Sequence, residues 1–520
     1  MRRLSTLEIL TAPDCSARAI AVVLAAALAF AAPATAAGQQ DTGKASPAEA
    51  VHFPGDAVSQ SSVVIDGETV EYTTRAGTLP LADADGNTLA NVFYISYTKN
   101  GVADPTERPL LFSFNGGPGS ASIWMHIGLL GPRRVQLGGG GGVNRDHSLA
   151  RLVPPAEMID NEYSMLDVAD LVFIDPVSTG YSRALPGVDA SQFHGFAEDI
   201  AAVAEFIRLY VSRNERWDSP KFIIGESYGT RRAAGLSGTL QGRMGMYLNG
   251  LILVSAGSMG QQFGNFGILQ YALSLPHAAA TAWYHEKLAA DLQTMPLREL
   301  LDEVEAFALD EFTVALLRGN KLTPPERGEI VTRVARFTGL SEEYVNAIHF
   351  RIDMDRFRKE LLRDQGLTVG RLDSRFTGID YDSGGETYEY DASMAAIRGP
   401  FTQTFNTYVR DELGYRSDLD YAVSGDVRPW NDPPANMNLL EALRSSMAQN
   451  PHLHVMIADG IYDKLYFWPE FTFSQFDFSG LRERISIETY ESGHMMYIDE
   501  GSLVKMKADM EALVDRALGR

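Results

Sequence analysis

The sequence predicts an α/β fold, a mostly parallel central sheet with helices on both faces and a helical cap inserted into it. Three observations predict this class. Apolar strand-like runs alternate with amphipathic helical stretches between residues 109 and 258. The same alternation returns after residue 450 and closes with a helix over residues 502–518. Between these two regions, residues 260–435 carry mostly helical patterns with charged faces.

These patterns divide the chain into consecutive parts. We expect a signal peptide over residues 1–36 and a flexible lead-in over residues 37–61. The α/β domain is expected in two pieces, residues 62–258 and 436–520, with the helical cap over residues 259–435 between them. From Ser62 the text alternates polar and apolar residues, which is typical of antiparallel strands at the start of a sheet.

The N-terminal residues resemble a secretory signal. Three arginines precede an apolar run over residues 19–32, and Ala34-Thr35-Ala36 offers a small-residue cleavage site. The apolar run is too short to span a bilayer as a stable helix. We therefore expect an exported protein, periplasmic or secreted, with no stable membrane insertion after cleavage.

Composition excludes several classes of partner and chemistry. The formal net charge of -22 argues against nucleic acid as a partner. The one cysteine, Cys15, lies in the expected signal peptide, so the mature chain would have neither disulfides nor thiol catalysis. No metal-ligand motif such as H-E-x-x-H occurs, and no cofactor is expected. The oligomeric state stays open.

The stretch over residues 221–236, KFIIGESYGTRRAAGL, carries the strongest chemical signal. A short apolar run enters Gly-Glu-Ser-Tyr-Gly, and a helical pattern follows. Strand, G-x-S-x-G, helix is the arrangement that exposes a serine hydroxyl above a sheet. The flanking glycines let backbone pass where a Cβ would clash. We predict that Ser227 is a nucleophile.

Two other glycine-rich stretches predict different structures. Asn115 to Gly119, NGGPG, follows an apolar strand, and such a turn either aims N–H groups at an anion or is an ordinary strand-to-helix connection. The run of five glycines over residues 138–142 is more typical of a loop than of a phosphate cradle. Between these regions and Ser227, residues 192–210 show helical spacing, with Ser191 as the expected N-cap.

A serine hydroxyl needs a base to take its proton and a carboxylate to orient that base. In α/β-hydrolases these follow the nucleophile in the order carboxylate, then histidine. His494 stands directly after the apolar strand ISIETY, in a loop where the base belongs. For the carboxylate, HVMIADGIYDKL offers Asp459 and Asp463; we prefer Asp463, because a loop position beyond the strand can reach the imidazole.

NGGPGSAS, DPVSTGYS, GESYG, GIYDKL and SGHMMY occur in this order in the chain. Together they resemble the serine carboxypeptidase family, particularly a bacterial, disulfide-free branch, over roughly residues 65–258 and 440–500. The resemblance implies the nucleophile Ser227, the orienting carboxylate Asp463 and the base His494. It also implies an oxyanion hole formed by the backbone N–H groups of Gly117 and Tyr228.

The resemblance further implies that Asn115, the Gly116 backbone and Glu226 bind the terminal carboxylate of the substrate. Two like charges in hydrogen-bond contact cannot both stay ionised, which implies an acidic optimum. One position departs from the family pattern: Leu129 stands where better-known members have a glutamate bonded to the counterpart of Glu226. Arg133 or Arg134, just beyond, could supply a cationic substitute, although surface positions suit both arginines.

The function predicted is an exported serine carboxypeptidase that hydrolyses C-terminal peptide bonds through an acyl-enzyme, with peptide or protein C-termini as substrates. An esterase or acyltransferase on the same scaffold is the alternative, and Leu129 favours it. A non-catalytic binding protein with a hydrolase fold is a further alternative, against which the presence of Ser, Asp and His argues. The sequence does not reveal the preferred C-terminal residue.

Overall fold

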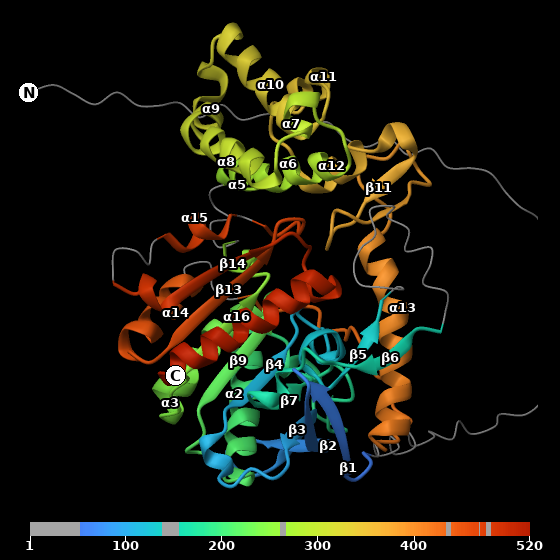
Figure 1. Ribbon diagram of the computed structural model, residues 1–520, viewed down its shortest axis with the longest axis vertical. Helices are drawn as coiled ribbons and strands as arrows, with labels where there is room; N and C mark the ends of the chain where they lie inside the picture. Colours follow the sequence, from blue (N-terminus) through green and yellow to red (C-terminus); the bar gives the residue numbers. More distant parts are fainter. Residues whose placement is uncertain (1–52, 138–154, 261–266, 433–437, 467, 475–479) are drawn as a thin grey trace, which may run out of the picture. The chain divides into compact units, whose positions relative to one another are not determined.

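The computed structural model describes residues 53–137, 155–260, 267–432, 438–466, 468–474 and 480–520 (Figure 1). The expected signal peptide, most of the lead-in and the run of five glycines lie outside these residues. A ten-stranded sheet is the centre of the fold, in the order β1-β2-β3-β7-β4-β9-β10-β13-β14, with β8 paired to β3. From β7 to β14 all neighbouring strands are parallel, as the alternation of strands and helices predicts.

The strands of this sheet have bounds close to the apolar runs of the sequence. They are β1 (Ala57–Ile65), β2 (Glu68–Ala82), β3 (Thr88–Lys99), β4 (Leu110–Phe114), β7 (Asp170–Ile174), β8 (Arg183–Ala184), β9 (Lys221–Glu226), β10 (Gly250–Val254), β13 (His454–Gly460) and β14 (Ile485–Tyr490). The first three strands are antiparallel to one another. β1 begins at Ala57, inside the range that the sequence assigned to a flexible lead-in, because its residues pair with β2 despite their small and polar side chains.

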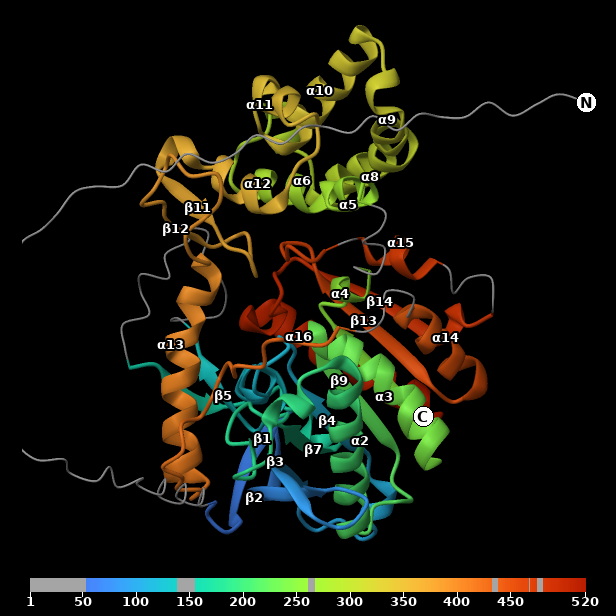
Figure 2. The same cartoon turned by 180° about the vertical axis from the view of Figure 1, so that it is seen from behind.

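Two hydrophobic cores lie on the two faces of the sheet. Successive side chains of a strand point to opposite faces, so Leu251 and Leu253 of β10 belong to one core and Ile252 and Val254 to the other. The first core also contains α2 (Phe196–Arg213), α3 (Tyr228–Met244) and α14 (Leu439–Gln449). The second contains α16 (Glu500–Leu518), which lies in front of the sheet in Figure 1 and behind it in Figure 2.

The start of α2 differs from the prediction. The helix begins at Phe196, with Gly195 as its N-cap, rather than at Gln192 after Ser191. Residues Ala190–Phe193 form a separate 3-10 turn, because the Asp189 side chain accepts a hydrogen bond from the Ser191 N–H and caps that turn instead. The hydrophobic residues keep helical spacing across the break between this turn and α2. Only the capping hydrogen bonds show that the helix starts after the break.

The chain between β10 and β13 is mainly helical, and several of its helices share a hydrophobic core of their own. Its helices are α4 (Gly257–Gly260), α5 (Leu269–Leu273), α6 (Leu275–Tyr284), α7 (Ala290–Gln293), α8 (Leu297–Phe307), α9 (Thr313–Arg318), α10 (Pro324–Thr338), α11 (Glu342–Ala347), α12 (Met354–Glu360) and α13 (Ala392–Thr407), followed by α14. A two-stranded sheet of β11 (Leu367–Val369) and β12 (Thr377–Ile379) interrupts them. The sequence does not predict it, because three residues are too few to show a period of two.

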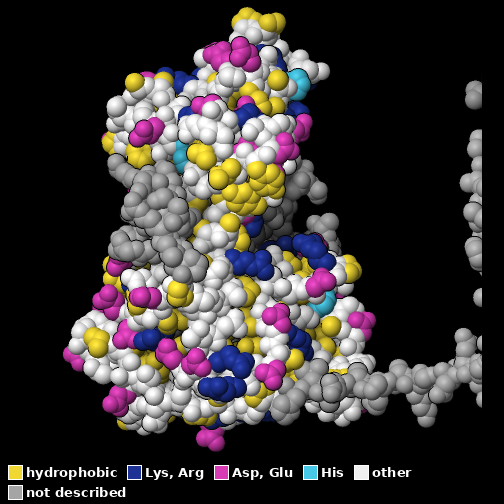
Figure 3. Space-filling model, turned by 90° about the vertical axis from the view of Figure 1, so that its right-hand side faces the viewer, with side chains coloured by type: hydrophobic (Ala, Val, Ile, Leu, Met, Phe, Trp, Pro, Cys, Tyr) yellow, Lys and Arg dark blue, Asp and Glu magenta, His cyan; other side chains and the backbone are white. Residues whose placement is uncertain are grey.

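The remaining elements are short. They include α1 (Ile123–Met125), the π-helical turn η2 (His126–Leu130), the hairpin β5 (Arg133–Gln136) and β6 (Glu157–Asp160), α15 (Pro469–Phe473) and the 3-10 turn η13 (Met496–Ile498). Among the described residues, no helix is long and apolar enough to cross a membrane. On the face drawn in Figure 3, acidic and basic side chains are interspersed.

A buried ion-pair network fixes the base of the sheet beside β4 and β7. Both oxygens of Asp170, the first residue of β7, pair with arginines: Oδ1 with Arg108 Nε and Oδ2 with Arg216 Nη1, each at 2.7 Å. The three side chains are 2%, 9% and 7% exposed in that order. Removing the carboxylate would therefore leave two guanidinium groups buried without their counter-charge.

We predict that Asp170→Ala lowers the free energy of unfolding by about 3–5 kcal/mol, because breaking a buried pair leaves its charge uncompensated. The measurement is urea denaturation followed by circular dichroism. Asp56→Ala is the matched control, since the Asp56–Arg75 pair is exposed on both sides and should contribute less than about 1 kcal/mol. Equal losses for the two variants would contradict the assignment of Asp170 to a structural centre.

Candidate active site

Ser227 occupies a strained turn between β9 and α3. Its backbone has φ 60° and ψ −124°, a left-handed conformation that a non-glycine residue rarely adopts. The chain can turn this sharply only without side chains on either side: a Cβ at Gly225 would lie 2.2 Å from the carbonyl oxygen of Gly229. The Ser227 N–H donates to the carbonyl of Val254, at the end of β10, over 2.9 Å. The turn therefore presents the hydroxyl at the carboxyl end of the parallel strands.

The glycine-rich turn after β4 runs directly against this elbow. A Cβ at Gly116 would lie 2.5 Å from both the Tyr228 nitrogen and the Glu226 carbonyl oxygen. Gly117 follows with φ 104°, which glycine adopts without strain. As the first residue of α3, Tyr228 has no acceptor for its N–H within the helix. Among the described residues, neither this N–H nor that of Gly117 donates to a backbone carbonyl.

The structure brings Asp463 and His494 together. Asp463 lies in the loop after β13 and His494 in the loop after β14, and Asp463 Oδ2 is 2.6 Å from His494 Nδ1. Both side chains are almost fully buried, at 3% and 5% exposed. The bond to Asp463 places the Nδ1 proton on the carboxylate side and leaves Nε2 as the basic nitrogen. The carbonyl of His494 accepts a hydrogen bond from Ser255 Oγ over 2.7 Å, at the end of β10.

The electrostatics of this pair favour the charged imidazole. Burial acts to lower the pKa of His494, but the Asp463 carboxylate and its hydrogen bond outweigh that effect. The negative charge of Glu226 acts in the same direction as Asp463. The pKa of His494 therefore lies above its ordinary value, which suits a base that must hold a proton during a reaction.

Asp459, the other carboxylate that the sequence offers, lies in β13, and its Oδ1 accepts the Ala256 N–H over 2.8 Å. Burial, together with the charge of Asp463, raises the pKa of Asp459 to about 7. Asp459 is the next-to-last residue of β13, which ends at Gly460.

Glu226 is buried and both of its carboxylate oxygens are engaged. Oε1 accepts from Asn115 Nδ2 over 3.0 Å, and Oε2 accepts from the Tyr497 hydroxyl over 2.6 Å. Burial raises the pKa of Glu226, and the nearby His494 and the two hydrogen bonds only partly offset that rise. Asn115 also accepts the Met125 N–H through its Oδ1, which fixes the orientation of its amide.

Leu129, at the position where the resemblance led us to expect a glutamate, does not contact Glu226 through a polar group. Leu129 is fully buried in the hydrophobic core beside the sheet. Neither candidate arginine replaces the missing carboxyl group: Arg133 pairs with Asp160 and Glu412, and the Arg134 guanidinium lies over the Tyr163 ring. The hydroxyl on Glu226 comes instead from Tyr497, which the sequence analysis did not identify.

A segment between β11 and β12 supports the histidine loop. The Leu372 carbonyl accepts the His494 N–H over 2.6 Å, and the Tyr462 carbonyl accepts the Ser374 N–H over 2.9 Å. Arg375 binds both oxygens of Asp373 and donates to the Glu491 carbonyl and to Ser492 Oγ. The connection between β11 and β12 therefore holds the loop that carries His494, a role that no local pattern in its sequence indicates.

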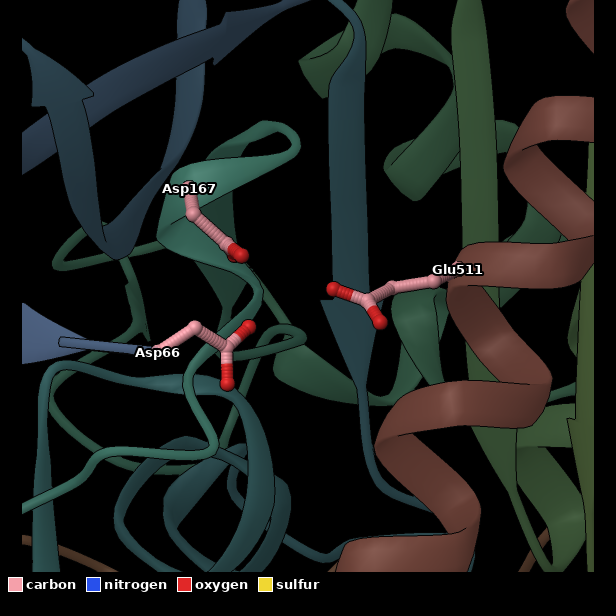
Figure 4. Close-up of side chains that lie close together, drawn as sticks. All are labelled: Asp66, Asp167 and Glu511. Carbon is pink, nitrogen blue, oxygen red and sulfur yellow. The ribbon is translucent and has the colours of Figure 1, made fainter. Parts of the chain in front are cut away.

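One group of three carboxylates outside this region has oxygens close enough to hold a cation. The side chains of Asp66, Asp167 and Glu511 converge in Figure 4, with one oxygen of each within 4.8 Å of the others. The Lys507 ammonium already pairs with Asp167 at 2.7 Å and with Glu511 at 2.8 Å. This cluster is therefore an ion-pair group that joins α16 to the rest of the domain.

Part of the chain matches a known protein family. Residues 66–242, which include the glycine-rich turn and the elbow, match the serine carboxypeptidase family model. The match covers less than half of the chain, so it shows similarity to this family over residues 66–242. Asp463 and His494 lie beyond the matched residues.

The curated proteins that the chain resembles are distant from it in sequence. Serine carboxypeptidase-like 50 of Arabidopsis thaliana is 27% identical over 294 residues, 54% of this chain and 56% of that protein. The pheromone-processing carboxypeptidase KEX1 of Saccharomyces cerevisiae (strain JAY291) is 29% identical over 165 residues, 30% of this chain and 20% of that protein. The sequence matches thus cover at most about half of these relatives.

A solved structure extends the likeness of the fold. The prohormone-processing carboxypeptidase Kex1(delta)p from Saccharomyces cerevisiae superposes with a TM-score of 0.50 at 15% identity, over 85% of this chain and 91% of that one. At this identity the likeness concerns the fold alone. It confirms the α/β-hydrolase fold that the alternation of strands and helices predicts.

We predict that Gly116→Ala lowers kcat at least 100-fold while the protein stays folded. The added Cβ would lie 2.5 Å from the Tyr228 nitrogen and must displace the turn from the elbow, and such displacements at a reacting centre are costly. The measurement is steady-state hydrolysis of an activated ester. Gly242→Ala in α3 is the control, since nothing lies within 4 Å of its Cβ position. Full activity of Gly116→Ala would show that this close contact is unimportant.

Proposed function

We propose that this chain is an exported serine carboxypeptidase that hydrolyses C-terminal peptide bonds through an acyl-enzyme intermediate. The observation that carries the proposal is the buried hydrogen bond of 2.6 Å between Asp463 and His494, held at the same end of β10 as the Ser227 elbow. A strained serine, a basic imidazole and a buried carboxylate are the parts of a serine hydrolase. The match of residues 66–242 to the serine carboxypeptidase family model supports the reaction class.

In the proposed mechanism, His494 Nε2 takes the proton of Ser227 Oγ as that oxygen attacks the carbonyl carbon of the last peptide bond. Negative charge develops on the carbonyl oxygen and is stabilised by the N–H groups of Gly117 and Tyr228, each contributing about 3–4 kcal/mol. His494 then gives its proton to the leaving amine as the C–N bond breaks. Water, deprotonated by His494, hydrolyses the acyl-enzyme and restores Ser227. Asp463 keeps the imidazole oriented and stabilises its charged form.

Asn115, the Gly116 N–H and Glu226 are the proposed contacts of the substrate's terminal carboxylate. A buried glutamate facing a carboxylate must share a proton with it. The raised pKa of Glu226 supports this, since the carboxyl group then holds a proton at a higher pH than an exposed one does. We therefore expect cleavage of free-acid peptides to be strongest at acidic pH and to weaken as Glu226 ionises.

Export rests on the N-terminal sequence alone. Residues 1–36 have the charged start, apolar run and small-residue site of a secretory signal, so we propose a periplasmic or secreted location. With Cys15 removed, the mature chain would need no disulfide for folding. The proposed substrates are peptide or protein C-termini, and the proposed reaction requires no metal or cofactor.

One observation favours a second candidate, an esterase or acyltransferase with the same three catalytic residues. Both Glu226 oxygens already have hydrogen-bond donors, and Arg133 and Arg134 interact with other side chains. If Glu226 stays ionised against Tyr497 and Asn115, it would repel a substrate carboxylate. A substrate without a free carboxylate would then be preferred.

The test is hydrolysis of one N-blocked dipeptide as free acid, amide and ester between pH 4 and pH 9. For the carboxypeptidase we expect cleavage of the free acid, strongest at acidic pH, and a loss of roughly 10⁵- to 10⁶-fold in kcat in Ser227→Ala. Asp463→Asn should lose about 10⁴-fold in kcat, because the wrong tautomer of His494 is then favoured.

Ser445→Ala, a substitution on the exposed side of α14, is the control and should leave all three rates unchanged. Cleavage of the ester alone would move the assignment to the esterase or acyltransferase. Free-acid hydrolysis that persists in Ser227→Ala would reject the proposed nucleophile.

A further inference from the structure

The partner of Glu226 on its Oε2 side is Tyr497, a residue separated from it by 271 positions. Tyr497 lies in the 3-10 turn η13, three positions after His494 in the chain, so one short loop supplies both a catalytic base and a donor to Glu226. The hydroxyl is 2.6 Å from Oε2, and the residue is only 3% exposed.

The ring of Tyr497 is held by close contacts. A Cβ at Gly128 would lie 2.6 Å from Tyr497 Cε2 and 3.2 Å from Phe401 Cε1, so the ring packs directly against the bare backbone of η2. In a close-packed interior, such contacts restrict the ring of Tyr497 to its observed position. The direction in which its hydroxyl points is therefore fixed before any substrate binds.

We infer that Tyr497 is a positioning residue. It orients Glu226 and controls the protonation state in which that carboxyl group binds a substrate carboxylate. The inference rests on the proposed function, in which Glu226 contacts the substrate terminus. It adds a residue that neither the motifs nor the family match assigns.

The hydroxyl acts on Glu226 as a hydrogen-bond donor. Burial and the charge of Glu226 hold the pKa of Tyr497 well above its ordinary value, so the hydroxyl keeps its proton. A donor to a carboxylate stabilises the ionised form. Tyr497 therefore opposes the effect of burial and lowers the pH at which Glu226 takes up a proton.

The other groups that face Glu226 act in known directions. Asn115, from the turn after β4, also donates to the carboxylate, and His494 favours its ionised form when charged. Asp463 acts in the opposite direction, by repulsion. Because Glu226 in turn raises the pKa of His494, a change at Tyr497 should shift the two groups in opposite directions.

The test is Tyr497→Phe, which keeps the ring contacts and removes only the hydroxyl. Without that donor, the pKa of Glu226 should rise by about one unit, given the strength of a hydrogen bond to a charged group. Free-acid peptides should then be cleaved up to a pH about one unit higher, mainly through KM. The pKa of His494 should fall, because a neutral Glu226 no longer supports the imidazolium.

Two measurements follow these shifts: the pH profile of kcat/KM for free acid and amide, and the titration of the His494 Nδ1 proton by NMR, which needs no substrate. Tyr490→Phe is the matched control, since this buried tyrosine also donates to a carboxylate, Asp509, over 2.7 Å. It should shift neither readout. Thermal unfolding checks that both variants are folded.

A widened free-acid profile in Tyr497→Phe, together with a lower His494 titration, is the expected result. An unchanged His494 titration, or the same change in Tyr490→Phe, would overturn the inference. If the wild type cleaves no free-acid peptide, the proposed function fails, while the NMR titration still decides whether Tyr497 acts on Glu226.

Discussion

Three consecutive residues, the last of β10 and the two that follow it, hold the candidate active site together. The Val254 carbonyl accepts the Ser227 N–H, Ser255 Oγ donates to the His494 carbonyl, and the Ala256 N–H donates to Asp459. The nucleophile turn, the base loop and the strand that leads to Asp463 are thus attached to one buried strand. β10 lies between β9 and β13 and is parallel to both, so the carboxyl ends of the three strands lie side by side. The pairing of these strands therefore fixes the positions of the reactive groups, although Asp463 and His494 themselves lie in loops.

The second constraint is the burial of carboxyl groups around His494. Asp463 stays paired with the imidazole, whereas burial raises the pKa of Glu226 and brings that of Asp459 to about 7. Burial thus raises the pKa values of two carboxyl groups near His494, and perturbed pKa values are typical of sites that perform acid and base chemistry. Tyr497 belongs to this arrangement, because it decides how readily one of these groups is protonated.

Local patterns predicted the parts of the site that are close in sequence. The apolar run before Ser227 and the glycines at its flanks define the elbow, and chain order led to Asp463 and His494, which the structure joins by a hydrogen bond. Contacts between distant segments had no such signal. Tyr497 is 271 positions from Glu226, to which it donates a hydrogen bond. Leu372, which accepts the His494 N–H, lies in the connection between β11 and β12. The short strands β11 and β12 and the break before α2 were missed because hydrophobic spacing does not register them.

Labelling with a fluorophosphonate, followed by peptide mapping by mass spectrometry, identifies an activated serine directly. Its phosphorus forms a bond to an activated serine oxygen as fluoride leaves, with no need for the correct peptide substrate. The account predicts one label, on Ser227, formed far more slowly in Asp463→Asn because the imidazole is no longer held as a base. A label on another residue, or equal rates in the two proteins, would contradict it.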